Sequence, residues 1–332
     1  MIDYVKLSHP IALSPKLFSR MKWKYLKTDD GQPYYLRTIR GVKLRYYELS
    51  QCFTISGKIL MLLHDSQVQN MDDIYGARTD LFLEELNEAL NKLFPSPVLD
   101  IRDFKVTKID YCFNVETPYV RTYLRFLEKA FRMTGTGKVN FTQEYNLDGS
   151  VYVKTQADYR DNTNKNYTLN FYDKTDRLHY LKEHGQHVSE ADFALAKDIL
   201  RLEVQCGYQM IKRQTEKFDI DNTFGNLLSF QIAYDTIATA YTRVFKGSSS
   251  TDFFTYTAAK LLLKGKPAAL KTIYVATSHR ITDHQYYHGS SQAKKAGVYP
   301  YSFLDRKSVP STLKNPLKLL QEKMMTYGAF PL

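Results

Sequence analysis

Three short stretches of the sequence carry side chains that together could transfer a phosphoryl group. Tyr172 lies in NFYDK, Asp110 in KIDYCFNV and Glu203 in LRLEVQC. A tyrosine hydroxyl can act as a nucleophile, and carboxylate oxygens are ligands that suit Mg²⁺ or Mn²⁺. Such an ion polarises a phosphate oxygen and stabilises the charge of the transition state. The trio is therefore a candidate site for metal-assisted phosphoryl transfer.

Side-chain alternation predicts that these three residues share one face of a sheet. Asp110 alternates with Ile109 and Tyr111, and Glu203 alternates with apolar residues of its own strand. If the apolar side chains pack on helices, Asp110, Glu203 and Tyr172 lie together on the opposite, exposed face. The same residue types also occur on solvated sheet faces as simple ion pairs, so the pattern alone leaves both interpretations open.

A tyrosine nucleophile needs help, because a free hydroxyl has a pKa of about 10. Lys174, two residues after Tyr172, and Arg201 are the candidate activating cations. Two other tyrosines compete for the role. Tyr167 precedes Tyr172 by an odd number of residues, so we expect it on the other face, and Tyr180 follows on a helix.

The elements that must position these residues alternate along the first half of the chain. We expect strands over residues 1–11, 52–62, 104–116, 151–155, 167–173 and 200–208, and helices over 81–94, after Thr117-Pro118, and over 176–197 with a break at Gly185. Two βαβ-like units in tandem predict an α+β fold, in which residues 1–210 form a ferredoxin-like or RRM-like antiparallel sheet with helices on one face.

The second half has a different character and a different charge. Residues 211–332 contain 17 Lys+Arg against 8 Asp+Glu, within a chain of net charge +11. We expect a second, mainly helical domain there, with helices over 222–246 and 252–264 and a short helix–turn–helix-like region near 290–300. A basic half beside a nearly neutral one indicates contact with phosphates, and 26 tyrosines offer stacking faces for bases.

The candidate DNA-binding cations cluster after the last strand and in the basic half. They are Arg201, Lys212, Arg213, Lys217, Lys264, Lys266, Lys294 and Lys295. Neutralising several phosphates would make binding strongly dependent on salt.

Cysteine usage and hydropathy bear on the compartment. Cys52, Cys112 and Cys206 are far apart and odd in number, which favours neither a disulfide framework nor a zinc site. The opening MIDYVKLSHPI reads as a strand rather than a signal peptide, and no apolar run is long enough to span a membrane. We expect a cytoplasmic protein without membrane contact.

With these motifs assembled, the chain resembles the gene II/X family of phage and plasmid replication proteins. The similar segments are MIDYVKLSHPI, FTISGKILML with VQNMDDIYG, TKIDYCFNV, NFYDKTDRL, LRLEVQC, AYTRVFKGSSSTDFF and AGVYPYSF. Lys108 stands where the family has Arg in its Arg-Ile-Asp strand. A similar trio occurs in the transposase-like (Rep_trans) initiators of staphylococcal plasmids, which is the second resemblance.

The resemblance implies an initiator of rolling-circle replication built on an HUH-related nicking and joining domain in residues 1–210. Tyr172 would attack one strand of the origin, leaving a 5′-phosphotyrosine link and a free 3′-OH, with Lys174 neutralising charge. Asp110 and Glu203 would hold Mg²⁺ or Mn²⁺, with His64 as a third ligand. The basic domain, residues 211–332, would bind double- and single-stranded origin DNA in a bacterial cytoplasm. A host helicase and polymerase are the implied partners, and a homodimer is left open.

One feature of HUH nucleases is missing from the sequence. Their metal is held by a His-hydrophobe-His triplet, and HQYYH (284–288) has three residues between its histidines. Two other functions therefore stay open. One is a non-catalytic DNA-binding regulator or accessory replication protein, and the other is an RNA-binding protein whose sheet stacks bases. The RNA function would need aromatic residues on the open face, whereas we expect Tyr111 and Phe113 to face the helices.

Overall fold

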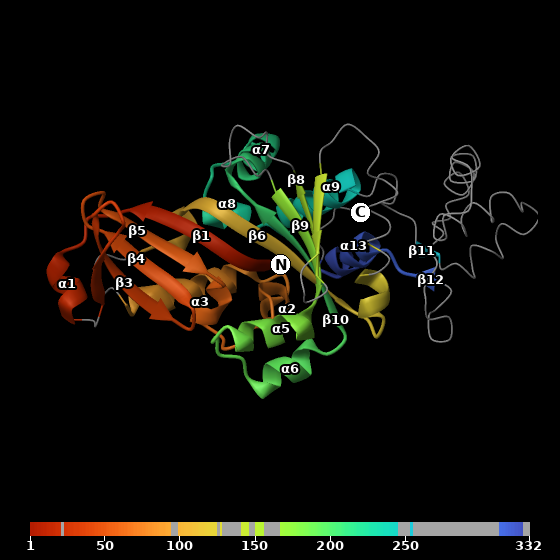
Figure 1. Ribbon diagram of the computed structural model, residues 1–332. Helices are drawn as coiled ribbons and strands as arrows, with labels where there is room; N and C mark the ends of the chain where they lie inside the picture. The colour runs from red at the N-terminus through yellow and green to blue at the C-terminus, as the bar shows by residue number, and fades with distance from the viewer. Residues whose placement is uncertain are drawn as a thin grey trace, which may run out of the picture.

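The computed structural model describes residues 1–20, 23–93, 99–124, 127, 141–145, 150–155, 167–244, 253–254 and 312–327. These residues have an α+β architecture dominated by one large antiparallel sheet (Figure 1). The expected α+β class and antiparallel sheet are confirmed.

Ten strands form this sheet, in the order β2-β3-β4-β5-β1-β6-β10-β9-β8-β7. Their bounds are β1 (Ile2–Pro10), β2 (Lys24–Lys27), β3 (Pro33–Ile39), β4 (Val42–Tyr47), β5 (Cys52–Gly57), β6 (Lys105–Glu116), β7 (Phe141–Tyr145), β8 (Val151–Thr155), β9 (Tyr167–Asp173) and β10 (Ile199–Cys206). A separate pair, β11 (Phe253–Phe254) and β12 (Thr312–Leu313), is also antiparallel. The centre of the sheet is therefore made of β1, β6, β10 and β9, which carry the candidate site.

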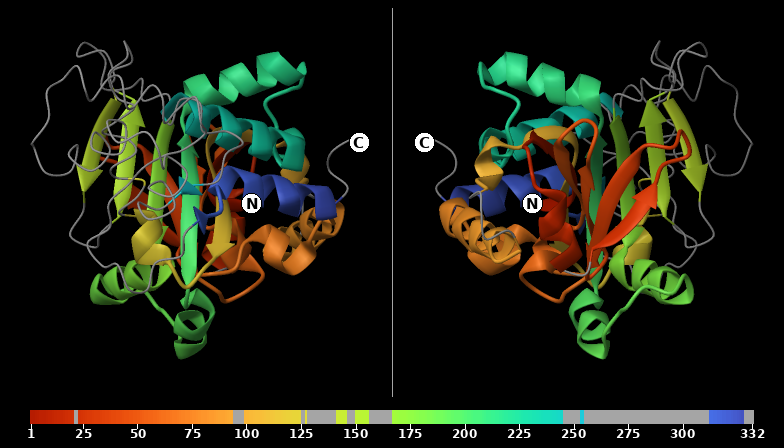
Figure 2. Two further views of the ribbon diagram at one scale, coloured as in Figure 1. Left: turned by 90° about the vertical axis from the view of Figure 1, so that its right-hand side faces the viewer. Right: turned by 90° about the vertical axis from the view of Figure 1, so that its left-hand side faces the viewer.

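The helices of the described residues surround this sheet. They are α1 (Pro15–Arg20), α2 (Met71–Tyr75), α3 (Thr79–Asn91), α5 (Lys174–Glu183), α6 (Glu190–Ala196), α7 (Tyr208–Phe218), α8 (Phe224–Leu227), α9 (Phe230–Val244) and α13 (Pro316–Thr326), with 3₁₀ turns η1 (Ile59–Leu62) and η2 (Ile101–Asp103). Figure 2 shows α3, α9 and α13 on one side of the strands, while α5 and α6 lie at one end of the sheet and α7 at the other.

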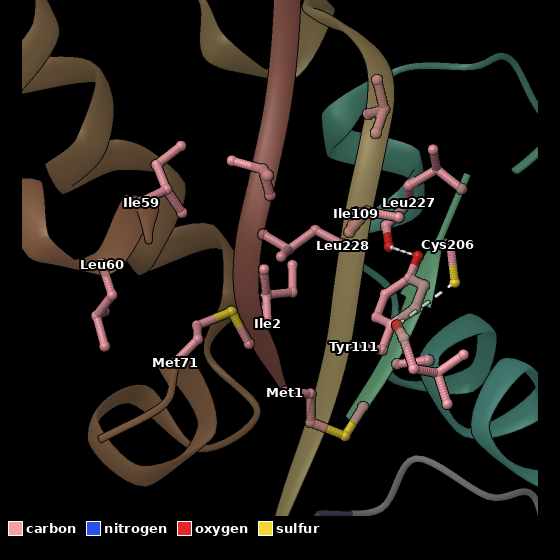
Figure 3. Packing of buried hydrophobic residues seen from close by; sticks show 14 of the residues in the cluster. Met1, Ile2, Ile59, Leu60, Met71, Ile109, Tyr111, Cys206, Leu227 and Leu228 are labelled. Carbon is pink, nitrogen blue, oxygen red and sulfur yellow. Dashed lines mark hydrogen bonds between the residues drawn. The ribbon is translucent and has the colours of Figure 1, made fainter. Parts of the chain in front are cut away.

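The apolar face of the central strands packs against these helices. Ile109 and Tyr111 of β6 and Cys206 of β10 belong to one continuous hydrophobic core (Figure 3). The hydroxyl of Tyr111 donates a hydrogen bond to the Leu227 carbonyl oxygen at 2.8 Å, which satisfies its one polar group inside the core. The alternation predicted for these strands is confirmed on this face.

The described helices of the C-terminal half share the core of the first half. Buried residues of α9 and α13, such as Ile237 and Leu320, belong to the same cluster as Val204 of β10. The predicted boundary at residue 210/211 therefore does not separate two cores among the described residues.

Most predicted elements of the central region match the structure, and two differ. Strands 151–155 and 167–173 have the predicted bounds, and the helical pair is interrupted around Gly185 as expected. The predicted strand 52–62 ends at Gly57 and continues as a 3₁₀ turn. The predicted helix 252–264 is wrong at its start, because Phe253–Phe254 pairs as strand β11; its remainder, and the turn near 290–300, lie outside the described residues.

Candidate active site

One cavity of about 350 Å³ brings the three sequence-predicted site residues together. It lies over the polar face of the central strands, between the β3–β4 turn and α5. Its lining consists of Asp3, Tyr4, Arg40, Gly41, Gly57, Lys58, Met61, Gln67, Lys108, Asp110, Tyr172, Lys174, Arg177, Leu181, Gln186, Glu203 and Gln205. Asp110, Glu203, Tyr172 and Lys174 thus line one space, as the alternation of the three strands predicted.

The strand register explains why these residues meet. Asp110 of β6 lies opposite Gln205 of β10, and Glu203 of β10 lies opposite Asn170 of β9. Because side chains two residues apart share a face, Tyr172 on β9 is a diagonal neighbour of Glu203.

The Tyr172 hydroxyl donates a hydrogen bond to Glu203 Oε2 at 2.8 Å. Glu203 Oε1 also accepts from the side-chain amides of Gln205, at 2.8 Å, and Asn170, at 3.3 Å. Burial and the adjacent Glu203 carboxylate raise the pKa of Tyr172 well above its usual value. The hydroxyl is therefore protonated at neutral pH, and it donates its proton to a hydrogen bond with Glu203.

Asp110 is buried beside one lysine and one carboxylate. Its Oδ2 lies 3.2 Å from Lys108 Nζ, whereas its Oδ1 has no hydrogen-bond partner among the described residues. Burial and the charge of Glu203 raise the pKa of Asp110 well above its usual range. Asn170 Oδ1 is likewise buried and unpartnered within the described chain.

This donor set fits a hard divalent cation. The oxygens of Asp110, Glu203, Asn170 and Gln205 are the ligand types that Mg²⁺ or Mn²⁺ takes. A cation there would also relieve the repulsion that raises the pKa of Asp110. Within the described ranges, no three His, Cys, Asp or Glu side chains gather into a metal site, so the two carboxylates would be assisted by amide oxygens and water.

The wall of the cavity opposite the β3–β4 turn is helix α5. Asp173 ends β9 and caps the helix, because its carboxylate accepts a hydrogen bond from the Thr175 amide at 2.9 Å. Lys174, Arg177 and Leu181 then follow at the i, i+3, i+7 spacing of one helix face, and all three line the cavity. The strand-to-helix corner thus places Tyr172 and Lys174 at the same space, with Lys174 Nζ 5.9 Å from the centre of the Tyr172 ring.

Arg201 has a different position from the one predicted for a DNA contact. Its side chain is fully buried, with Nη1 2.6 Å from Asp3 Oδ1 and Nε 2.9 Å from Asn114 Oδ1. It also donates to the Val68 carbonyl oxygen. These contacts enclose the guanidinium, so the prediction that Arg201 touches DNA is wrong for this conformation, and its role is to support the polar face from within.

His64 is separated from the predicted metal ligands. Its Nε2 lies 2.7 Å from the Tyr75 hydroxyl, which in turn donates to Glu85 Oε2 at 2.5 Å. His64 does not line the cavity of Asp110 and Glu203. The expectation that His64 is the third metal ligand is therefore wrong for this cavity, because the imidazole is paired with the Tyr75 hydroxyl instead.

The competing tyrosines are separated from the cavity as well. Tyr167 belongs to the hydrophobic core on the helix side of β9, as its odd spacing predicted. Tyr180 is exposed on α5, where its ring stacks on His184 with centroids 3.9 Å apart. Neither lines the cavity, so Tyr172 is the one of these three tyrosines that does. Tyr4 of β1, opposite Asp110, lines it as well, but the hydroxyl that donates to Glu203 is that of Tyr172.

The predicted cationic residues after the last strand lie on α7, at the opposite end of the sheet from α5 (Figure 2). Lys217 Nζ is 2.5 Å from Asp235 Oδ1, Lys212 Nζ is 3.6 Å from Glu216 Oε1, and Arg213 is exposed. Lys264, Lys266, Lys294, Lys295 and the HQYYH segment lie outside the described residues.

Sequence reasoning missed Asp3 and Lys58, which also line the cavity. The pairing of β1 with β6 shifts between Ile2 and Tyr4, so Asp3 is the extra residue of a β-bulge. Strict alternation therefore misplaces this part of β1. Asp3 and its partner Arg201 are 198 positions apart, so no local pattern in a single sequence shows that they pair.

No helix of the described chain is long and apolar enough to cross a membrane. A scan against protein-family models and a search of curated proteins found no match to this chain. The chemistry of the cavity is therefore the basis for assigning a function.

Proposed function

We propose that the protein is a metal-dependent DNA nicking and joining enzyme that uses Tyr172 as its nucleophile and initiates rolling-circle replication. The observation that carries the proposal is the hydrogen bond from the Tyr172 hydroxyl to Glu203 Oε2, inside a cavity that Asp110 and Lys174 also line. A nucleophile in contact with a base, with cations and carboxylates around it, is the arrangement that phosphodiester transesterification needs.

The reaction is a transfer between two hydroxyl groups. Tyr172 Oη attacks the phosphorus and forms the Oη–P bond, while its proton passes to Glu203 Oε2. The P–O3′ bond breaks, and the 3′ oxygen leaves as a hydroxyl when the proton received by Glu203 passes to it through water. The product is a 5′-phosphotyrosine and a free 3′-OH. The reverse attack by a 3′-OH rejoins the strand and restores the tyrosine.

The chain's own residues supply most of what this step requires. Glu203 orients the hydroxyl, and Lys174 lies beside the ring to face the negative charge of the phosphate. Asp110 and Glu203, with Asn170 and Gln205, would hold Mg²⁺ or Mn²⁺, which would supply Lewis-acid neutralisation of the developing charge.

A row of cations on the same sheet face supports nucleic acid as the substrate. The row crosses four neighbouring strands. Ser56 of β5 lies between Lys43 of β4 and Lys6 of β1. Lys6 in turn lies opposite Lys108 of β6. Lys6 and Lys43 are exposed, and Lys108 lines the cavity. A phosphate backbone that follows this row would reach Tyr172. The HUH-related character of residues 1–210 and origin binding by residues 211–332 are part of the same proposal.

A labelled single-stranded oligonucleotide pool with Mn²⁺ tests the proposal. We expect a protein–DNA adduct that survives denaturant, and we expect Tyr172→Phe to abolish it while DNA binding persists. An unchanged adduct in Tyr172→Phe would move the nucleophile elsewhere. Binding without an adduct on any candidate origin would instead indicate the non-catalytic DNA-binding regulator.

A further inference from the structure

Two buried lysines face the cavity, and neither has a carboxylate of its own. They are Lys58, from the end of β5, and Lys174, from the start of α5. They come from opposite halves of the sheet, so the cavity is the place where these halves meet.

Lys58 is held in position by the backbone before it. Gly57 has a φ of +142°, and a Cβ at this position would lie 3.0 Å from the Val42 Cα, so only glycine fits without a shift. The Lys58 Nζ is buried and makes no hydrogen bond within the described chain. Its nearest carboxylate oxygen is Asp3 Oδ1 at 3.8 Å, which is already bound by Arg201 at 2.6 Å.

Lys174 is in a similar electrostatic position. It is 3% exposed, and its ammonium group lies 5.9 Å from the centre of the Tyr172 ring. Burial and the nearby Arg201 charge lower the pKa of Lys174 well below its usual value, and burial lowers that of Lys58 to about 8. Burial therefore disfavours the charged form of both lysines, and an anion bound between them would stabilise their ammonium forms and be attracted by them in turn.

Two arginines extend this positive potential to the rim. Arg177 is one turn after Lys174 on α5, and Arg40 lies across the cavity in the β3–β4 turn. Arg40 and Gly41 have φ values of +46° and +84°, the pattern of a tight two-residue hairpin turn. Residues other than glycine seldom adopt a positive φ, so the arginine at position 40 is consistent with a role for its side chain.

We infer that Lys58 and Lys174 form an anion site that holds the non-bridging oxygens of the phosphodiester attacked by Tyr172. This inference rests on the proposed function and adds Lys58 as a substrate-contacting residue. The site lies next to the nucleophile, and its volume of about 350 Å³ is in the range of small-ligand pockets. Lys58 would stabilise charge that grows on the phosphate as the Oη–P bond forms.

Crystals of the full chain soaked in sodium tungstate, a phosphate mimic with a strong anomalous signal, test the site without any chemistry. We expect an anomalous peak within hydrogen-bond reach of Lys58 Nζ and Lys174 Nζ. The peak should disappear in Lys58→Met and persist in Lys92→Met, a matched control at the exposed lysine that directly follows α3. A wild-type protein without the peak, or a Lys58→Met protein that keeps it, would overturn the inference.

The rate of adduct formation is the second measurement. We expect Lys58→Met to lower it about 10²-fold, with Lys58→Arg recovering part of the loss and Lys92→Met unchanged. An unaltered rate in Lys58→Met would also overturn the role of Lys58. If wild-type protein forms no adduct but the tungstate peak still depends on Lys58, the nicking function fails while the anion site stands.

Discussion

The central strands have two faces that are both buried, but one is apolar and the other is polar. On the helix side, Ile109, Tyr111 and Val204 are packed in a continuous hydrophobic core. On the opposite side, Asp110 and Glu203 from the same strands are only 3% and 5% exposed, yet they line a cavity. Burial of apolar groups stabilises the fold, whereas buried charges raise its free energy unless they are paired. Under the proposed function, the polar face would carry the chemistry, while the apolar face stabilises the fold.

Substitutions at two neighbouring residues of β10, Glu203 and Leu202, should have the largest and most different effects on adduct formation and on stability. We expect Glu203→Gln to lower the rate of adduct formation by about 10²- to 10³-fold, because the amide cannot take the proton of Tyr172. Its free energy of unfolding should change by less than about 1 kcal/mol, since the shape of the side chain is kept. Quenched-flow adduct assays and urea denaturation measure the two quantities.

Leu202→Ala is the matched control on the other face of the same strand. Leu202 is fully buried in the core, so truncation should lower the free energy of unfolding by about 2–5 kcal/mol. The adduct rate of the folded fraction should stay within a few-fold of wild type. If Leu202→Ala instead reduced adduct formation as strongly as Glu203→Gln, the two faces would not be functionally separate.

Among the polar residues of this region, Arg201 should contribute to the free energy of unfolding. In Arg201→Met, Asp3 loses a partner at 2.6 Å and the Asn114 and Val68 oxygens lose their donor. We expect a loss of about 3 kcal/mol, because Asp3 is left with only the more distant Lys58 and two further oxygens lose their hydrogen-bond donor. Chemical denaturation would show this, and recovery of most of the loss in the double variant with Asp3→Asn would locate the cause in the pair.

One ion pair within the helix layer predicts a pH dependence. Asp72 Oδ2 lies 2.6 Å from Lys323 Nζ of α13. Burial alone would raise the pKa of Asp72, but the amino groups of Met1 and Lys323 lower it to about 2, from 3.8. The folded state thus holds the ionised form more strongly than the unfolded state, and the pair stabilises the protein fully above pH 4.

We expect this contribution, about 2 kcal/mol, to be lost as the pH falls from about 4 to 2. Denaturation midpoints at several pH values would measure it. Asp72→Asn should remove that part of the acid dependence, whereas Asp80→Asn, at an exposed carboxylate of α3, should leave it unchanged. An Asp72→Asn protein with the wild-type acid profile would contradict the assigned pair.

Tyr111→Phe is expected to have the smallest effect. It removes one hydrogen bond to the Leu227 carbonyl at 2.8 Å, which should lower the free energy of unfolding by about 1 kcal/mol. Adduct formation should be unaffected, because Tyr111 lies on the apolar face. A loss of adducts in this variant, measured alongside Tyr172→Phe, would break the distinction between the two tyrosines.

The regular parts of this molecule could be predicted from the sequence, because strand alternation is a local property. Asp110, Glu203 and Tyr172 face one way for the same reason that Tyr111 and Val204 face the other. Alternation does not reveal burial, however, and the face expected to be exposed is enclosed by α5 and neighbouring segments.

The residues that sequence reasoning missed depend on long-range geometry. Asp3 reaches the cavity through a bulge, and Lys58 reaches it because Gly57 turns the chain there. Arg201 was misread as a DNA contact, since a lone sequence does not show that Asp3 and Asn114 enclose it. Such contacts join residues about 90 to 200 positions apart, beyond any local pattern.

Peptide mapping of the denatured adduct by mass spectrometry tests the central claim most directly. After incubation with single-stranded origin DNA and Mn²⁺, followed by nuclease and protease digestion, we predict a nucleotide 5′-phosphate joined to Tyr172, in the peptide that spans the β9–α5 corner. Attachment to Tyr167, Tyr180 or another residue, or the absence of any modified peptide, would contradict the assignment of Tyr172 as the nucleophile.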